Sequence, residues 1–385
     1  MFQRIFVSFL AVLFVFTTSN LPAQQDYEVA VTYVSVWVKA VDDNGNPVEA
    51  LSQNDFEVYE DGTPVQITCF DEVKIAEKDA STEQAETPVA TERFVIYLDL
   101  LNTTPREYQA IKPGLKQFLN DISKRNAEVM LAGLMPTQKL GIIAPFTKDL
   151  RRLSALIDQA PANAARDTVY ETRRNEISKI LEGAGDDPID ALRDGYQTAR
   201  QFANADRALS HFTLSAIESF AEHLSTQDFG GHIIMLYVSG GFSSDPGREY
   251  FDMIDSLAEG QIQQEEMMQV TMDRNFNFDF RKEMQKSIGK LNRLNVTIST
   301  LDTQGMSSTS EYRDSLQQVA DETGGISISN SQNFKAGFKT ILKDFEHQYI
   351  LCYTPPPQKK EGYRKIKVVV KRPGVKLRYR QGYSE

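Results

Sequence analysis

The chain has 385 residues and a formal net charge of −11 at pH 7. A chain of this length can bury a large core without disulfide staples, and its length predicts two or three domains. The acidic balance favours solubility and argues against general nucleic-acid binding.

The first 23 residues predict a secretory signal peptide. Met1–Arg4 is short and basic, the run IFVSFLAVLFVF is apolar, and Ala23 stands before the sequence QQDYE. This arrangement is typical of a signal peptide cut after Ala23, and the apolar run is short for a membrane span. No later segment reads as a transmembrane helix. We therefore expect an exported protein of the periplasm or the extracellular space, with an uncleaved anchor as the alternative.

Residues 27–73 predict the N-terminal part of a small β-sandwich domain. A long strand pattern leads into the turn sequence DDNGNP, and an Asp-Gly turn separates the strands DFEVYE and TPVQITCF. Residues 74–92 contain no aromatic side chain and are rich in Ala, Thr and Glu. This composition predicts an exposed linker.

Residues 93–347 predict an α/β domain. Apolar strand patterns such as FVIYLDL, EVMLAGLM, HIIMLYVS and VTISTLD alternate with segments of helical pattern. Such alternation indicates a mostly parallel, doubly wound sheet with helices on both faces. The first of these strands ends at Asp99, and the carboxyl end of a buried parallel strand is where open α/β sheets place their ligand sites.

Residues 348–385 return to strand patterns and predict the C-terminal part of the β-sandwich. Each terminal β segment has too few strands for a stable core, so we expect the two to pack together with the α/β domain inserted between them. Cys69 and Cys352, the only two cysteines, lie in these segments. Export into an oxidising compartment predicts a disulfide between them, with two buried free thiols as the alternative.

A basic run lies near the C-terminus. From Lys359 to Arg380 there are ten Lys or Arg residues and one acid. The run is compatible with an anionic partner or with a solvated strand face. The alternation in VKLRYR favours the second reading: it predicts that Lys376, Arg378 and Arg380 point outward.

Several motifs resemble a known family. They are YLDLLNTT at the first α/β strand, FTKDLRRL (residues 146–153), VSGGF (238–242), ETGG (322–325) and the C-terminal block from 349 to 383. With these motifs the α/β part resembles a von Willebrand factor A domain. The chain after the signal peptide resembles the VWFA-related domain family of exported bacterial proteins, of the acidobacterial type. The resemblance implies a metal-ion-dependent adhesion site at the carboxyl end of the sheet.

The first half of that site follows the pattern Asp-x-Ser-x-Ser. Here Asp99 and Thr103 match the pattern, whereas Leu101 stands at the first serine position and has no oxygen to offer. Asp99 and Thr103 would form a thin, degenerate site for a divalent cation such as Mg²⁺, which prefers six oxygen ligands. The reading that we favour for Asp99 is that it caps the helix that follows, with metal binding as the alternative.

The second half of the site is the turn that begins at Ser239. The family pattern has an Asp in this turn, but the sequence reads Ser-Gly-Gly, and Asp245 further along is a candidate substitute. We therefore expect a degenerate ligand-binding site that recognises its partner without depending on a metal. Its residues are Asp99, Thr103, Ser239, Gly240 and Asp245.

No motif indicates catalysis. The four histidines show no short metal-ligand spacing, and Ser239 does not lie in a Gly-x-Ser-x-Gly elbow. We therefore expect a non-enzymatic module without a cofactor that recognises a protein or a cell-surface ligand. The alternatives are a structural or assembly component of the cell envelope with no ligand at this edge and, more weakly, a hydrolase.

Overall fold

The computed structural model describes residues 33–74, 92–183, 188–226, 232–258, 280–307, 310–357 and 362–384. The predicted signal peptide lies outside these residues, and so does the predicted linker apart from its two boundary residues. Those two belong to strands, because β4 (Ile67–Lys74) ends at Lys74 and β5 (Glu92–Asp99) begins at Glu92.

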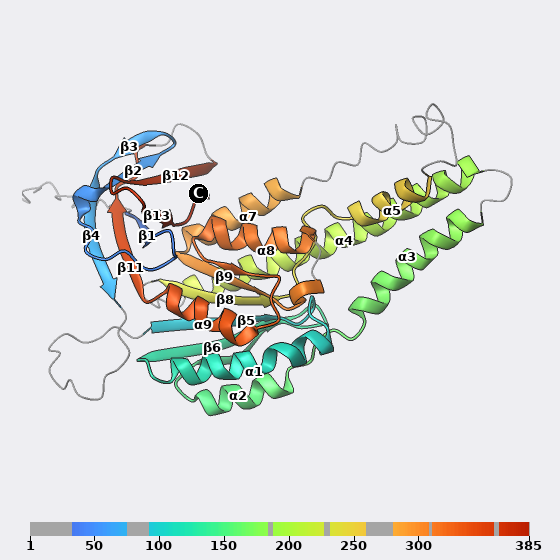
Figure 1. Ribbon diagram of the computed structural model, residues 1–385, viewed down its shortest axis with the longest axis horizontal. Helices are drawn as coiled ribbons and strands as arrows, with labels where there is room; N and C mark the ends of the chain where they lie inside the picture. The colour runs from blue at the N-terminus through green and yellow to red at the C-terminus, as the bar shows by residue number, and fades with distance from the viewer. Residues whose placement is uncertain are drawn as a thin grey trace, which may run out of the picture. The chain divides into compact units, whose positions relative to one another are not determined.

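A six-stranded sheet forms the centre of the α/β part (Figure 1). Its order is β10-β9-β8-β5-β6-β7, and every pair is parallel except β6–β7. The further strands are β6 (Ala127–Leu134), β7 (Leu140–Thr147), β8 (Ile233–Ser239), β9 (Val296–Asp302) and β10 (Ser327–Ile328). The mostly parallel sheet predicted from the sequence is confirmed.

Helices cover both faces of this sheet, which is why its central strands are continuous apolar runs. Every residue of β8 and β9 is buried. One face packs against α1 (Pro105–Ile122), α2 (Leu150–Gln159) and α9 (Phe334–Asp344). The other face packs against the C-terminal half of α4 (Pro188–Ser225), α7 (Arg281–Arg293) and α8 (Ser310–Thr323).

Three helices form a separate small core, which we call the helical arm. It consists of α3 (Arg166–Glu182), the N-terminal half of α4 and α5 (Arg248–Ala258), which run alongside one another in Figure 1. Their shared core contains Ile177, Leu192, Tyr196, Ala199, Tyr250 and Ile254. Across the described ranges, no helix is both long and apolar enough to span a membrane.

Strands from the two ends of the chain pair with each other in two four-stranded sheets. The first has the order β13-β1-β11-β4 and the second β14-β12-β2-β3. Their bounds are β1 (Val34–Val41), β2 (Phe56–Glu60), β3 (Thr63–Val65), β11 (His347–Tyr353), β12 (Tyr363–Val370), β13 (Lys376–Arg378) and β14 (Gly382–Ser384). Inward-facing residues of both sheets share one hydrophobic core.

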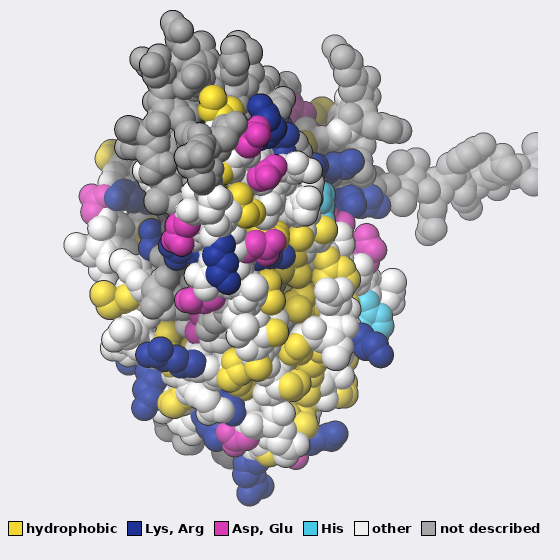
Figure 2. Space-filling view, turned by 90° about the vertical axis from the view of Figure 1, so that its right-hand side faces the viewer, with side chains coloured by type: hydrophobic (Ala, Val, Ile, Leu, Met, Phe, Trp, Pro, Cys, Tyr) yellow, Lys and Arg dark blue, Asp and Glu magenta, His cyan; other side chains and the backbone are white. Residues whose placement is uncertain are grey.

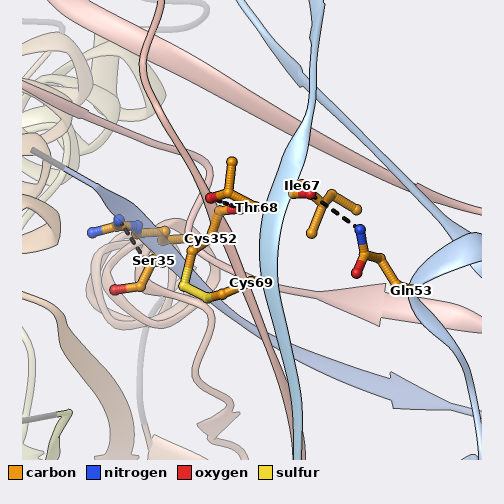
Figure 3. The surroundings of a disulfide bond; sticks show 7 residues. Ser35, Gln53, Ile67, Thr68, Cys69 and Cys352 are labelled. Carbon is orange, nitrogen blue, oxygen red and sulfur yellow. Dashed lines mark hydrogen bonds between the residues drawn. A yellow bond between two sulfur atoms is a disulfide. The ribbon is translucent and has the colours of Figure 1, made fainter. Parts of the chain in front are cut away.

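Cys69 and Cys352 lie directly opposite each other on β4 and β11 (Figure 3). Their Cα atoms are 4.8 Å apart, and a disulfide joins them across 283 residues of sequence. A bond that closes so long a loop restricts the unfolded chain strongly.

The basic residues of β13 correct one sequence-based expectation. Lys376 points to solvent, but Arg378 and Arg380 do not. Arg378 forms an ion pair with Asp344 of α9, and Arg380 is only 8% exposed and donates a hydrogen bond to the main-chain oxygen of Asn292. Strand alternation was read correctly, but α/β residues contact the outward side chains of Arg378 and of Arg380, which follows β13, whereas Lys376 stays exposed.

A buried lysine belongs to the same contact. Lys39 of β1 is 3% exposed, and its Nζ lies 2.6 Å from Asp344 Oδ2 and 3.2 Å from the main-chain oxygen of Gly324. Burial lowers the pKa of Lys39, and the Asp344 carboxylate opposes that shift. The sandwich therefore meets the α/β part through paired and hydrogen-bonded cations.

Candidate functional site

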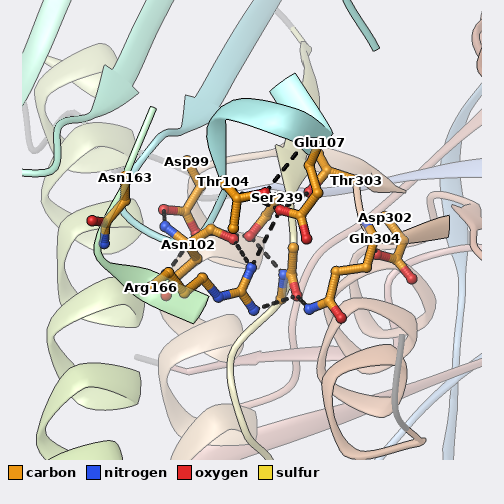
Figure 4. A network of polar contacts seen from close by, with 12 residues as sticks. Asp99, Asn102, Thr104, Glu107, Asn163, Arg166, Ser239, Asp302, Thr303 and Gln304 are labelled. Carbon is orange, nitrogen blue, oxygen red and sulfur yellow. Dashed lines mark hydrogen bonds and ion pairs between the residues drawn. The ribbon is translucent and has the colours of Figure 1, made fainter. Parts of the chain in front are cut away.

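The carboxyl ends of three neighbouring strands meet at one edge of the parallel sheet. Asp99 ends β5, Ser239 ends β8 and Asp302 ends β9, with Ser239 and Asp302 paired in register. The strand order reverses between β5 and β8, and in doubly wound sheets this switch point leaves a crevice in which ligands bind. We take this edge as the candidate site (Figure 4).

Asp99 is fully buried, and protein donors fill its carboxylate. Oδ1 accepts from the Asn102 main-chain N–H at 3.1 Å. Oδ2 accepts from Asn102 Nδ2 at 2.9 Å and from Tyr237 Oη and Ser239 Oγ, both at 2.7 Å. A carboxylate has about four acceptor positions, so this network satisfies the buried charge. Burial and the Asp99 charge raise the pKa of Tyr237 well above its usual range, which keeps its hydroxyl a donor.

Asp99 does not cap the following helix, which corrects the reading favoured from the sequence. The cap of α1 is Thr104, whose Oγ1 accepts from Glu107 N at 3.3 Å while Glu107 Oε2 accepts from Thr104 N at 2.8 Å. Pro105 occupies the first helical position, where its missing N–H has no consequence. The sequence TPRE carries this capping box and could have identified the cap.

The other first-strand residues do not gather around Asp99. Leu101, at the position of the missing serine, packs into the hydrophobic core. Thr103 is 1% exposed; its main-chain oxygen accepts from Asn163 N at 2.9 Å, and its Oγ1 has no hydrogen-bond partner within the described ranges. Thr103 is therefore buried beside the site but is not joined to the Asp99 carboxylate.

Asp245 lies in the turn between β8 and α5, close to the start of α5. Its side chain is 40% exposed, and its carboxylate lies 4.0 Å from Arg248 Nη1 at the start of α5. Asp99 accepts its four bonds from other residues, as described above. That Asp245 substitutes for the missing carboxylate of the family pattern stays a prediction.

A guanidinium group that the sequence analysis missed lies between the ends of β5 and β8. Arg166, the first residue of α3, donates to the main-chain oxygen of Asn102 and, at 3.1 Å, to that of Gly240. Its Nη1 is 3.6 Å from Glu107 Oε2, and its guanidinium lies 5.3 Å from the ring centre of Tyr312. The side chain is 17% exposed. No local sequence motif identifies Arg166 as a residue that contacts the strand ends.

Arg166 explains why residue 240 is a glycine. A Cβ atom built on Gly240 would overlap the Arg166 guanidinium and the main-chain oxygen of Asn102. The φ angle of Gly240 lies outside the left-handed region, so space and not backbone conformation excludes a side chain here. The family pattern has an Asp in this turn, and this structure holds an arginine in the corresponding space.

These residues are a poor ligand set for a divalent ion. An ion at Asp99 would have to displace protein donors and would meet the positive charge of Arg166. Within the described part of the chain, no group of three or more His, Cys, Asp or Glu residues is arranged to hold a metal.

Ser239 has no histidine partner among the residues that the structure describes. Its Oγ donates to Asp99 and accepts from Gly241 N at 2.9 Å. His232 precedes the opposite end of β8, roughly 20 Å away at the rise of an extended strand. His347 bonds Glu72, and His211 pairs with Glu283.

Two exposed hydrophobic side chains border the site. Val169 is 46% exposed and lies one turn after Arg166 on α3. Met306 is 65% exposed and follows Gln304, whose Nε2 donates to the same Gly240 oxygen that Arg166 holds, at 2.5 Å. We call Val169 and Met306 the edge patch. Figure 2 views the molecule from the side of the helical arm and shows a band of hydrophobic side chains.

No family model matches the chain, and no curated protein sequence matches it. Solved structures give distant likenesses. An aerotolerance-related membrane protein from Bacteroides fragilis is 11% identical, with 66% of this chain and 98% of that chain covered and a TM-score of 0.31. BatB from Bacteroides thetaiotaomicron is 12% identical, with coverages of 66% and 98% and a TM-score of 0.29. The pilus adhesin SpaC from Lactobacillus rhamnosus GG is 10% identical, with coverages of 90% and 42% and a TM-score of 0.34.

Proposed function

We propose that this chain is an exported, non-enzymatic recognition module. In this proposal its von Willebrand A-like domain binds a protein partner at the carboxyl edge of the sheet without a divalent ion. The supporting observation is the arrangement of Arg166 and Asp99: protein donors fill the carboxylate, and an arginine lies between the strand ends. In this proposal the Arg166 guanidinium takes the place of the divalent ion that the family resemblance implies.

The edge patch supplies the contact surface in this proposal. Exposed apolar side chains that lie near one another mark recognition surfaces more often than scattered ones do. Val169 lies three residues after Arg166 and Met306 two residues after Gln304, and both Arg166 and Gln304 donate to the Gly240 oxygen. Residues that are already ordered lose less entropy on binding than mobile ones do.

The main alternative is a structural component with no ligand at this edge. The closed hydrogen-bond network around Asp99 would serve that role equally well, because it holds β5 and β8 together without any partner. A hydrolase is the weaker alternative, since Ser239 Oγ donates to Asp99 and meets no histidine in the described ranges.

Site-specific crosslinking separates these functions. A photoreactive benzoylphenylalanine replaces Met306 in the full chain, which is irradiated with the envelope of its source cells in the presence of EDTA. We expect one saturable crosslinked partner, which unlabelled wild-type chain displaces and the Val169→Asp/Met306→Asp chain does not.

The matched control is Ile142→Asp on β7. Ile142 is 43% exposed, close to the value for Val169, but lies on the edge strand of the sheet. This variant should displace the crosslink as well as wild type does. Equal displacement by the edge-patch variant would contradict recognition at this surface. Loss of the crosslink in EDTA would contradict metal independence, and absence of any saturable partner would favour the structural alternative.

A further inference from the structure

Helix α3 contacts both the candidate site and the helical arm. Arg166, its first residue, holds the main-chain oxygens at the ends of β5 and β8. One and two turns later, Tyr170 and Arg173 contact the other two helices of the arm. Rigid secondary elements and the hydrogen-bond networks attached to them are what carry coupling between separate parts of a protein.

The arm contacts involve two partly buried acids. Tyr170 Oη donates to Glu249 Oε2 of α5 at 2.5 Å, and Arg173 Nη1 donates to Asp206 Oδ1 of α4 at 2.5 Å. Arg173 also donates to the hydroxyl of Tyr250, at 3.3 Å. Each of the three helices therefore contributes a polar group to one cluster.

We propose that α3 is a lever in which the ionisation of Glu249 and Asp206 sets how firmly Arg166 holds the strand ends. The proposal concerns the chain alone and does not depend on the identity of a partner.

The charges around the two acids give the direction of the effect. Burial raises the pKa of Glu249, the Asp206 charge raises it further, and the Tyr170 hydrogen bond, Arg174 and Arg173 oppose the shift. Burial also raises the pKa of Asp206, against Arg173 and the hydrogen bond from Tyr250.

Because the folded-state pKa of each acid is raised, protonation of the acids favours the folded chain over the unfolded one. That stability is present below the pKa of the unfolded chain and is lost as pH rises through the folded-state value. Arg166 should therefore hold the strand ends most firmly in mild acid.

Hydrogen exchange at the strand ends tests the lever. The reporters are peptides that cover residues 99–104 and 238–243, because Gly240 N donates to the Asn102 oxygen that Arg166 also holds. After correction for intrinsic exchange rates, we expect protection of both peptides in wild type to fall severalfold between mild acid and pH 8. In Glu249→Gln, which keeps an acceptor for Tyr170 but carries no charge, the fall in protection should be clearly smaller than in wild type, because only Asp206 still titrates.

The control for charge is Glu176→Gln. Glu176 is exposed on the same helix, so this variant should follow the wild-type pH profile. Arg166→Ala should show low protection at every pH. A wild-type profile in Glu249→Gln would overturn the proposal, and so would altered exchange in arm peptides without any change at 238–243.

Tyr170→Phe keeps the test decisive if Glu249→Gln loses helical structure. It removes a single hydroxyl and with it the bond to Glu249. The pH response at residues 238–243 should shrink, and an undiminished response would overturn the lever.

Discussion

Asp99 is a charged side chain with no solvent exposure, so its effect on stability depends on its four donors. Asn has nearly the same shape, but an NH2 group replaces one carboxylate oxygen. That group cannot accept the hydrogen bonds that the surrounding protein donors offer. We expect Asp99→Asn to lower the free energy of unfolding by roughly 3 kcal/mol, well above the ~1 kcal/mol typical of a lost helix cap. Urea denaturation of the full chain measures this difference, with Thr104→Ala, the real cap of α1, as the ~1 kcal/mol reference.

A variant at Asp99 also tests whether a divalent ion binds at this site. A site occupied at about 100 times its Kd would stabilise the fold by ~2.7 kcal/mol and raise the melting temperature by several degrees. We expect the melting temperature in EDTA to equal that in about 1 mM Mg²⁺, Mn²⁺ or Ca²⁺, the range that weak extracellular sites need. A rise with metal in wild type that disappears in Asp99→Asn would contradict the metal-free site.

The turn that joins β8 to α5 packs closely against Arg166 at the start of α3, because residue 240 of the turn is a glycine and has no side chain. A methyl group on Gly240 would collide with the Arg166 guanidinium and with the Asn102 oxygen. We expect Gly240→Ala to cost about 1–3 kcal/mol, as overpacking does. Combined with Arg166→Ala the cost should be less than additive, because one of the two obstacles has gone. A double-mutant cycle by urea denaturation measures this coupling.

Gly141→Ala on β7 is the control for this cycle. A Cβ atom there would meet only the end of the Met135 side chain, at 3.9 Å. Its effect should be small and should add independently to that of Arg166→Ala. Strict additivity for the Gly240 pair as well would contradict the close packing of the guanidinium against this turn.

Elements with a local signal could be predicted, whereas contacts between distant elements could not. The apolar run of β5 and the terminal position of Asp99 are local, and they led to the correct strand and the correct sheet edge. Arg166 lies 64 residues from Asn102 in sequence, and nothing around it distinguishes it from a surface arginine. Alternation along residues 375–380 likewise gives two opposite sides of this segment but not what covers each side, so Arg378 and Arg380 were assigned to solvent.

At the scale of the whole molecule, the β-sandwich and the α/β part share a contact built around an aromatic pair. The ring of Trp37, the only tryptophan, stacks on His232 at 4.2 Å between ring centres. His232 Nε2 lies 2.7 Å from Thr297 Oγ1. Burial, with smaller contributions from the Lys39 and Arg380 charges, lowers the pKa of His232 to about 3. The imidazole is therefore neutral in the folded chain at pH values where an unfolded chain binds a proton.

This difference predicts how stability depends on pH. The contribution of His232 is fully present above pH ~6.5, the usual value for an unfolded histidine, and is lost as pH falls toward the folded value. The loss is at most about 1.4 kcal/mol per pH unit. The raised pKa values of Glu249 and Asp206 act in the opposite direction, so the informative quantity is the difference between variants.

Urea titrations between pH 7 and about 4 should show a shallower loss of stability in His232→Gln than in wild type. The exposed His223→Gln on α4 should keep the wild-type slope. Equal slopes in wild type and His232→Gln would mean that the imidazole accepts its proton within the folded contact, and that this contact does not set the acid limit of the fold.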